Sequence, residues 1–326
     1  MILSSVLCSS ALVYKGFSAF FNKAFSLLGI CIKYSSVLIF GNISGFIVGP
    51  KLLSEEIDLN FDKSETTRLI LLSSNAGIGF VVSFVGQTIF KNFLFGLAIY
   101  IFQILTSFIL NSLIFFKRKN CVFSEIKYQR KPFLTSITDS ISKTTSSMIS
   151  ICSYTVVFSI LLSVIVKCLN LSGKPILSTI LYALFDVTQG VKSASALENR
   201  YISLFLVGFS VGFGGISIFL QIFSICNNLK IYKYIFIASK FTQGIICGIF
   251  SLFLSIGLKF EPNNVDAFIF ERKNLPIYAI LFTLSCTLIV KKHINLKILL
   301  NCVEFFKKII YNIKGKYYFG GSHGRK

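Results

Sequence analysis

Long apolar runs, separated by short clusters of charge, constrain the fold of this chain more than any other feature. The runs span residues 34–50, 69–90, 92–116, 144–166, 175–191, 201–229, 234–258 and 275–290. A helix needs about 20 apolar residues to cross a bilayer, and four or five of the runs plainly reach that length. Only 14% of the residues are charged, against about 25% in a typical soluble protein, so a soluble fold and disorder are both excluded. The sequence therefore predicts an all-α, polytopic membrane protein.

The formal net charge of +20 is concentrated in two segments. Most of it lies in 117–131 and 291–326, and both segments flank apolar runs. Basic loops next to membrane spans stay on the cytoplasmic side, so we expect both segments to be cytoplasmic. They are either solvated loops without a partner or, in addition, attracted to anionic membrane lipid. With that explanation the charge does not indicate a nucleic-acid partner. The segment 16–33 has apolar residues at helical spacing and predicts an amphipathic helix.

Four of the apolar runs contain residues that interrupt helices. Backbone that leaves the helix at membrane depth is tolerated only where it is buried in protein or lines a cavity, so these runs predict broken helices or re-entrant hairpins around a binding site. The candidate substrate-binding residues in them are Asn42, Ser44 and Gly45 in the first run, Ser73, Ser74, Asn75 and Gly77 in the second, Thr188 and Gly190 in the third, and Gly214, Gly215 and Gln221 in the fourth. Hydrogen bonding and close packing between helices is the alternative role for these residues.

The interrupted runs form two pairs, and each pair precedes a long apolar run, 92–116 or 234–258. With the basic segments inside, these two long helices point in opposite directions across the membrane. That arrangement predicts an inverted repeat, with the binding site at the midplane near the broken helices. We place the first repeat at 1–131, the second at 132–290, and a basic tail at 291–326.

Two charged residues lie inside apolar runs. Asp186 is a candidate ion-coupling residue, because an ionisable group at membrane depth is costly and usually functional. Its alternative role is to cap a half-helix near the membrane interface. Lys240 is a candidate counter-ion for an anionic solute, and the alternative is that it snorkels to the cytoplasmic interface. The nine cysteines form no CxxC motif and there are only two histidines, so the sequence indicates no metal site and no cofactor.

Five short motifs resemble, in order, those of the sporulation integral membrane proteins of the YlbJ type. The motifs are SGFIVGPKL (44–52), SSNAGIGF (73–80), DVTQG (186–190), GFGGISIFLQ (212–221) and KFTQG (240–244). Two positions depart from the family pattern: Ile47 stands where the family has Pro, and Asp186 stands where it usually has Glu. The resemblance covers roughly residues 17–250.

The resemblance implies a nucleoside-recognition (gate) domain protein in the mother-cell-derived membrane around the forespore. It also implies a role in late spore maturation, with dipicolinate as the substrate candidate. From the pattern of breaks we predict a transporter of a small, anionic solute that works by alternating access. The rival hypotheses are a non-transporting membrane scaffold needed for sporulation and an intramembrane enzyme, and we expect no enzymatic activity. The sequence leaves a homo-oligomer open.

Overall fold

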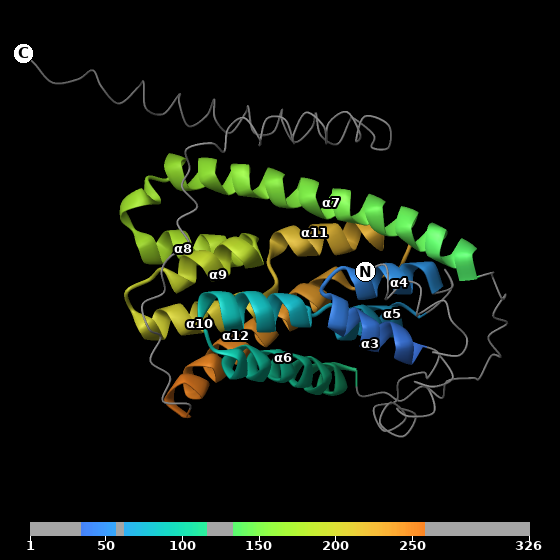
Figure 1. Cartoon of the computed structure of the whole chain (residues 1–326), viewed down its shortest axis with the longest axis horizontal. Helices are drawn as coiled ribbons and strands as arrows, with labels where there is room; N and C mark the ends of the chain where they lie inside the picture. The colour runs from blue at the N-terminus through green and yellow to red at the C-terminus, as the bar shows by residue number, and fades with distance from the viewer. Residues whose placement is uncertain (1–33, 57–61, 116–132, 258–326) are drawn as a thin grey trace, which may run out of the picture. The chain divides into compact units, whose positions relative to one another are not determined.

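The computed structural model describes residues 34–56, 62–115 and 133–257 (Figure 1). Every regular element within these ranges is helical, which confirms the all-α prediction. The predicted amphipathic helix 16–33, the basic segments 117–131 and 291–326 and the apolar run 275–290 lie outside the described residues.

Four helical stretches of the described chain are long and apolar enough to cross a membrane, so the chain is a membrane protein. They are Phe93–Ile114, Met148–Cys168, Arg200–Ile225 and Lys233–Leu254. The first is helix α6, and the second belongs to α7 (Phe133–Cys168). The third comprises α10 (Arg200–Phe213) and α11 (Ile216–Ile225), and the last belongs to α12 (Lys233–Gly257). The outer face of α6 exposes a row of large apolar side chains: Ile101, Leu105, Ile109 and Leu113. Such a face suits contact with lipid tails, because it would be unfavourable in water.

Each of the four predicted interruptions divides a run into two helices. In the first half, α3 (Ser35–Ser44) is followed by α4 (Val48–Glu56), and α5 (Lys63–Ser73) is followed by the π-helix η2 (Gly79–Ile89). In the second half, after the short 3₁₀ turn η3 (Leu171–Gly173), α8 (Pro175–Phe185) is followed by α9 (Val187–Ser195), and α10 (Arg200–Phe213) by α11 (Ile216–Ile225). The expectation of broken helices is therefore confirmed.

Each half of the chain contains a close contact between a glycine and a serine of its own helices. A Cβ atom built on Gly49 of α4 would lie 2.5 Å from Cβ of Ser73 on α5. A Cβ atom built on Gly190 of α9 would lie 2.8 Å from Oγ of Ser210 on α10. In each half, a glycine in the first broken pair thus lets its helix approach a serine in the second pair. The Cβ atom on Gly190 would also lie 2.6 Å from Cα of Ala183. The repeat stays a prediction, and its boundaries at 131 and 290 lie outside the described residues.

Helices α10 and α12 pack against each other through glycines on both sides. Gly208 and Gly212 of α10 lie against α12 near Cys247, and Gly248 of α12 lies against the ring of Phe205 on α10. A Cβ atom on Gly208 would come within 2.5 Å of the carbonyl oxygen of Cys247. Residues spaced as GxxxG let two helix backbones approach closely, and here both partners have that spacing.

Candidate functional site

The four helix breaks meet in space, although they are spread over much of the chain. A Cβ atom on Gly77 would lie 2.9 Å from the carbonyl carbon of Ser44, so the second break touches the first. A Cβ atom on Gly214 would lie 2.9 Å from the ring of Phe46, so the fourth break also touches the first. A Cβ atom on Gly215 would lie 2.8 Å from the carbonyl oxygen of Phe185, next to the third break. These pairwise contacts run from the second break to the first, from the first to the fourth and from the fourth to the third, and so connect the two halves of the chain.

Backbone conformation explains why glycine occupies these positions. Gly45, Gly214 and Gly215 have φ angles of 115°, 88° and 101°. L-residues rarely adopt such angles, because their Cβ atom would clash with the backbone, whereas glycine adopts them without strain. The sharp reversals place the first turns of α4 and α11 at the meeting point, and helix N-termini favour negative charge.

Lys240 of α12 reaches the second break and is buried there. Its side chain is only 1% exposed. Its Nζ donates to the carbonyl oxygen of Ser74, to Oδ1 of Asn75 at 3.1 Å and to Oε1 of Gln243 at 3.0 Å. All three partners are neutral, and in the described part of the chain no carboxylate lies within ion-pair distance of this ammonium. Lys240 therefore does not snorkel to the interface, which was the alternative drawn from the sequence.

Amide side chains hold this second break in place. Asn75 donates through Nδ2 to Oδ1 of Asn42 at 2.7 Å. Asn42 in turn donates to the carbonyl oxygen of Leu72 at 3.0 Å. Gln103 of α6 donates to the carbonyl oxygen of Ala76 at 2.7 Å, while its own Oε1 is buried without a hydrogen-bond partner. The carbonyl groups released by the break are thus bonded by side chains, as a non-helical segment inside a membrane requires.

Asp186 forms the third break and caps the helix that follows it, which is the alternative role considered from the sequence, while its role in ion coupling stays a prediction. Its side chain is 4% exposed. Oδ1 accepts from the backbone N–H of Gln189 at 2.9 Å, so Asp186 is the N-cap of α9. Oδ2 accepts from the hydroxyl of Ser217 on α11 at 3.5 Å, and the carboxylate also accepts a backbone hydrogen bond from Thr188. A buried carboxylate that links two helix breaks is well placed to take up a proton or a cation.

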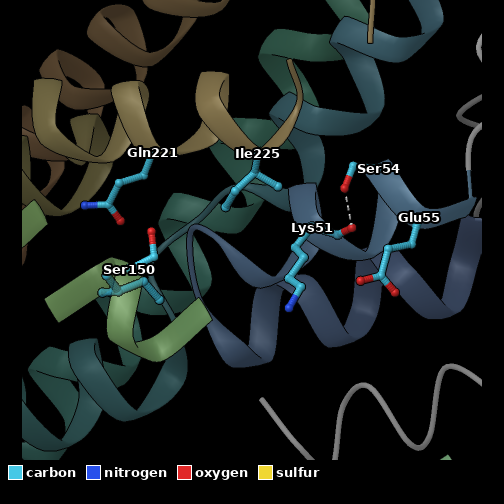
Figure 2. A pocket seen from close by; sticks show the side chains of 7 residues that line it. Lys51, Ser54, Glu55, Ser150, Gln221 and Ile225 are labelled. Carbon is cyan, nitrogen blue, oxygen red and sulfur yellow. Dashed lines mark hydrogen bonds between the residues drawn. The ribbon is translucent and has the colours of Figure 1, made fainter. Parts of the chain in front are cut away.

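Gln221 lies elsewhere, in the wall of a cavity of about 270 Å³ between α4, α7 and α11 (Figure 2). Figure 2 shows Gln221 and Ser150 on one side of this cavity and Lys51, Ser54 and Glu55 on the other. Gln221 is 4% exposed and its Oε1 has no hydrogen-bond partner. None of the residues that bond Lys240 lines this cavity.

The remaining predicted residues lie at the breaks or in packing contacts. Ser44 and Thr188 are partly buried beside the first and third breaks. Ser73 donates to the carbonyl oxygen of Ile70 within its own helix, and Gly190 lies against Ala183 and Ser210. These contacts account for Ser73 and Gly190 structurally, and their roles in substrate binding remain predictions.

Two glutamines at this site, Gln103 and Gln243, were not predicted from the sequence; both bond the second break beside Lys240. Gln243 donates through Nε2 to Oδ1 of Asn75 and to the carbonyl oxygen of Gln103, both at 2.9 Å. A signal was present, because Gln243 follows Lys240 at i,i+3 and so lies on the same face of its helix. Gln103 is a polar residue in the middle of an apolar run, which is itself a reason to expect a helix–helix contact. In the described residues, no group of three or more His, Cys, Asp or Glu could hold a metal ion.

Comparison of the chain with protein-family models, curated proteins and solved structures gave no match.

Proposed function

We propose that this membrane protein transports a small anionic solute, which binds where the four helix breaks meet. The observation that carries the proposal is the buried Nζ of Lys240, which donates to three neutral oxygens at the second break. Three donated bonds need the three N–H groups of the ammonium form. A buried charge without an opposite charge is strongly unfavourable in a low-dielectric interior. A bound anion near the break would supply the missing negative charge, so the site favours anions over neutral solutes.

The helices that begin at the breaks add to this preference. The N-terminal ends of α4, η2, α9 and α11 all adjoin the breaks. Each helix N-terminus carries a partial positive charge and backbone N–H groups that suit a carboxylate or a phosphate. Asp186 occupies the N-terminus of α9. We assign to it the uptake of a proton or cation that is coupled to movement of the solute.

The repeat of broken helices supports alternating access as the transport mechanism. In transporters built from inverted repeats, the two halves move against each other around a site at their interface. The contact of Phe46 with Gly214 joins the first half to the second at the meeting point of the breaks. A change in how the halves pack would therefore act directly on the site.

The resemblance to the YlbJ type supplies the candidate solute and the setting. Dipicolinate carries two carboxylates on a small aromatic ring, and such a dianion suits a site with a buried cation and helix N-termini. The proposed setting is spore maturation, in the mother-cell-derived membrane around the forespore, with the basic segments 117–131 and 291–326 on the cytoplasmic side.

The test is uptake of labelled dipicolinate into proteoliposomes that contain the purified protein. We expect uptake by the wild type, loss of uptake in Lys240→Met, and normal uptake in Lys233→Met, which removes an exposed lysine at the start of the same helix. A panel of other small carboxylates and of nucleosides would be run in parallel. Uptake of nucleosides alone would refute the anionic substrate. Absence of uptake for the whole panel would refute transport and favour the membrane scaffold.

A further inference from the structure

The oxygen atoms around Lys240 form the kind of site that binds a monovalent cation. A backbone carbonyl at a helix break, from Ser74, combines with the side-chain oxygens of Asn75 and Gln243. Carbonyl oxygens of unwound helices are the groups that coordinate coupling ions in transporters built from broken helices. Here the ammonium of Lys240 occupies the position between them.

The oxygens are also held in place by bonds that do not involve Lys240. Oδ1 of Asn75 accepts from Nε2 of Gln243 at 2.9 Å, and Nδ2 of Asn75 donates to Asn42 at 2.7 Å. Nε2 of Gln243 also donates to the carbonyl oxygen of Gln103 at 2.9 Å. Because these bonds orient both amide groups, their oxygens should keep facing the same point when the lysine side chain is removed. Such a polar cavity takes up water or an ion rather than staying empty.

We propose that Lys240 is a tethered cation, which fills a monovalent-cation site at the second helix break. The ammonium then supplies, as part of the chain, the charge that an ion-coupled transporter would take from solution as Na⁺ or K⁺. Two consequences follow. Removal of the side chain opens the site to an external cation. The wild-type protein needs no alkali cation for its activity, so that of the two coupling ions considered for Asp186 it takes up the proton. The second consequence rests on the proposed transport function, whereas the first does not.

The experiment measures the thermal stability of the purified Lys240→Ala protein in detergent. A thiol-reactive dye is a suitable reporter, because Cys226 and Cys247 are free and buried and the chain has no tryptophan. Melting curves would be recorded in sodium chloride, potassium chloride or methylammonium chloride, with N-methylglucamine chloride as the reference at equal ionic strength. We expect at least one of the small cations to raise the Tm of Lys240→Ala by a few degrees, since a ligand that binds only the folded state stabilises it.

Matched variants separate a specific site from a general effect of salt. The wild type and Lys233→Ala, which lacks an exposed lysine on the same helix, should show no difference between the small cations and N-methylglucamine. The double variant Lys240→Ala, Gln243→Met loses one oxygen of the site, and its response should be weaker or absent. The proposal is overturned if Lys240→Ala responds to the small cations no more than the wild type does.

A second measurement covers the case in which Lys240→Ala does not fold in N-methylglucamine chloride. The protein would then be extracted and purified in each of the four salts, and its recovery as a monodisperse peak compared. Higher recovery in sodium, potassium or methylammonium chloride supports the site, and equally poor recovery in all four overturns it.

The wild-type protein tests the consequence for coupling. Solute uptake should be the same in sodium, potassium and N-methylglucamine buffers. A requirement for Na⁺ or K⁺ would overturn the tethered cation and leave the transport function intact. Absence of any uptake would instead refute the transport function, and the melting curves of Lys240→Ala would still decide whether the cation site exists.

Discussion

Substitution of Gly208 by alanine tests the close packing of α10 against α12. The added Cβ atom would lie 2.5 Å from the carbonyl oxygen of Cys247 and 2.8 Å from Oγ of Ser251. A carbon and a carbonyl oxygen normally stay about 3.3 Å apart or more. The two helices must therefore separate by several tenths of an ångström, because the carbonyl belongs to the backbone of α12 and cannot rotate away.

The expected magnitude follows from two opposing terms. Overpacking of this kind costs about 1–3 kcal/mol. Replacement of glycine by alanine inside a helix returns up to about 1 kcal/mol. We therefore expect a net loss of about 1–2 kcal/mol, and at about 2–4 °C per kcal/mol for a protein of this size the Tm should fall by several degrees.

The assay is the melting curve of the purified protein followed with a thiol-reactive dye. Gly79→Ala is the matched control, because Gly79 begins η2 and a Cβ atom there would meet nothing within 4 Å. Its Tm should stay the same or rise. If Gly208→Ala melts at the same temperature as Gly79→Ala, the two helices are not packed as closely as described and the reasoning fails.

Two further predictions concern Asp186 and Gln221. Asp186→Asn keeps an oxygen that can accept from the N–H of Gln189, so its melting temperature should match the wild type, whereas Asp186→Ala loses the N-cap and about 0.5–2 kcal/mol of stability. If the carboxylate couples transport, Asp186→Asn should lose uptake while it keeps the fold, and normal uptake would remove Asp186 from the mechanism. Gln221→Leu removes a buried oxygen that has no partner, so the Tm should be unchanged or higher. A marked fall in its Tm would mean that this oxygen is bonded in the folded protein, for example to a water molecule in the cavity.

The places where helices break could be predicted from the sequence because their causes are local. Glycine tolerates the positive φ angles of Gly45, Gly214 and Gly215, and Asp186 accepts a hydrogen bond from a helix that starts immediately after it. Lys240 could not be assigned in this way. Seven residues into its helix, the side chain is long enough to reach either the interface or the bundle interior, so the sequence left both positions open.

Contacts between distant segments decide which polar residues come together at the second break and which line the separate cavity. Gln103 and Gln243 lie on different helices, and only their packing against the second break brings them to Asn75 and Lys240. Gln221 shares a broken run with Gly214, yet it lines a separate cavity because α11 carries it away from the break. Periodicity within one run contains no information about which other run faces it.

Composition and the spacing of apolar runs, by themselves, determined that this chain is an all-α membrane protein with four interrupted helices. Insertion into a membrane depends on the free energy of transferring each residue from water into the bilayer, and a helix break depends on the φ and ψ angles that the residue can adopt. Both quantities are set locally in the sequence. Tertiary structure alone decided that the four breaks meet and that a buried ammonium lies among neutral oxygens at one of them. A buried charge depends on its neighbours in space, and the neighbours of Lys240 come from residues 74–75 as well as from its own helix.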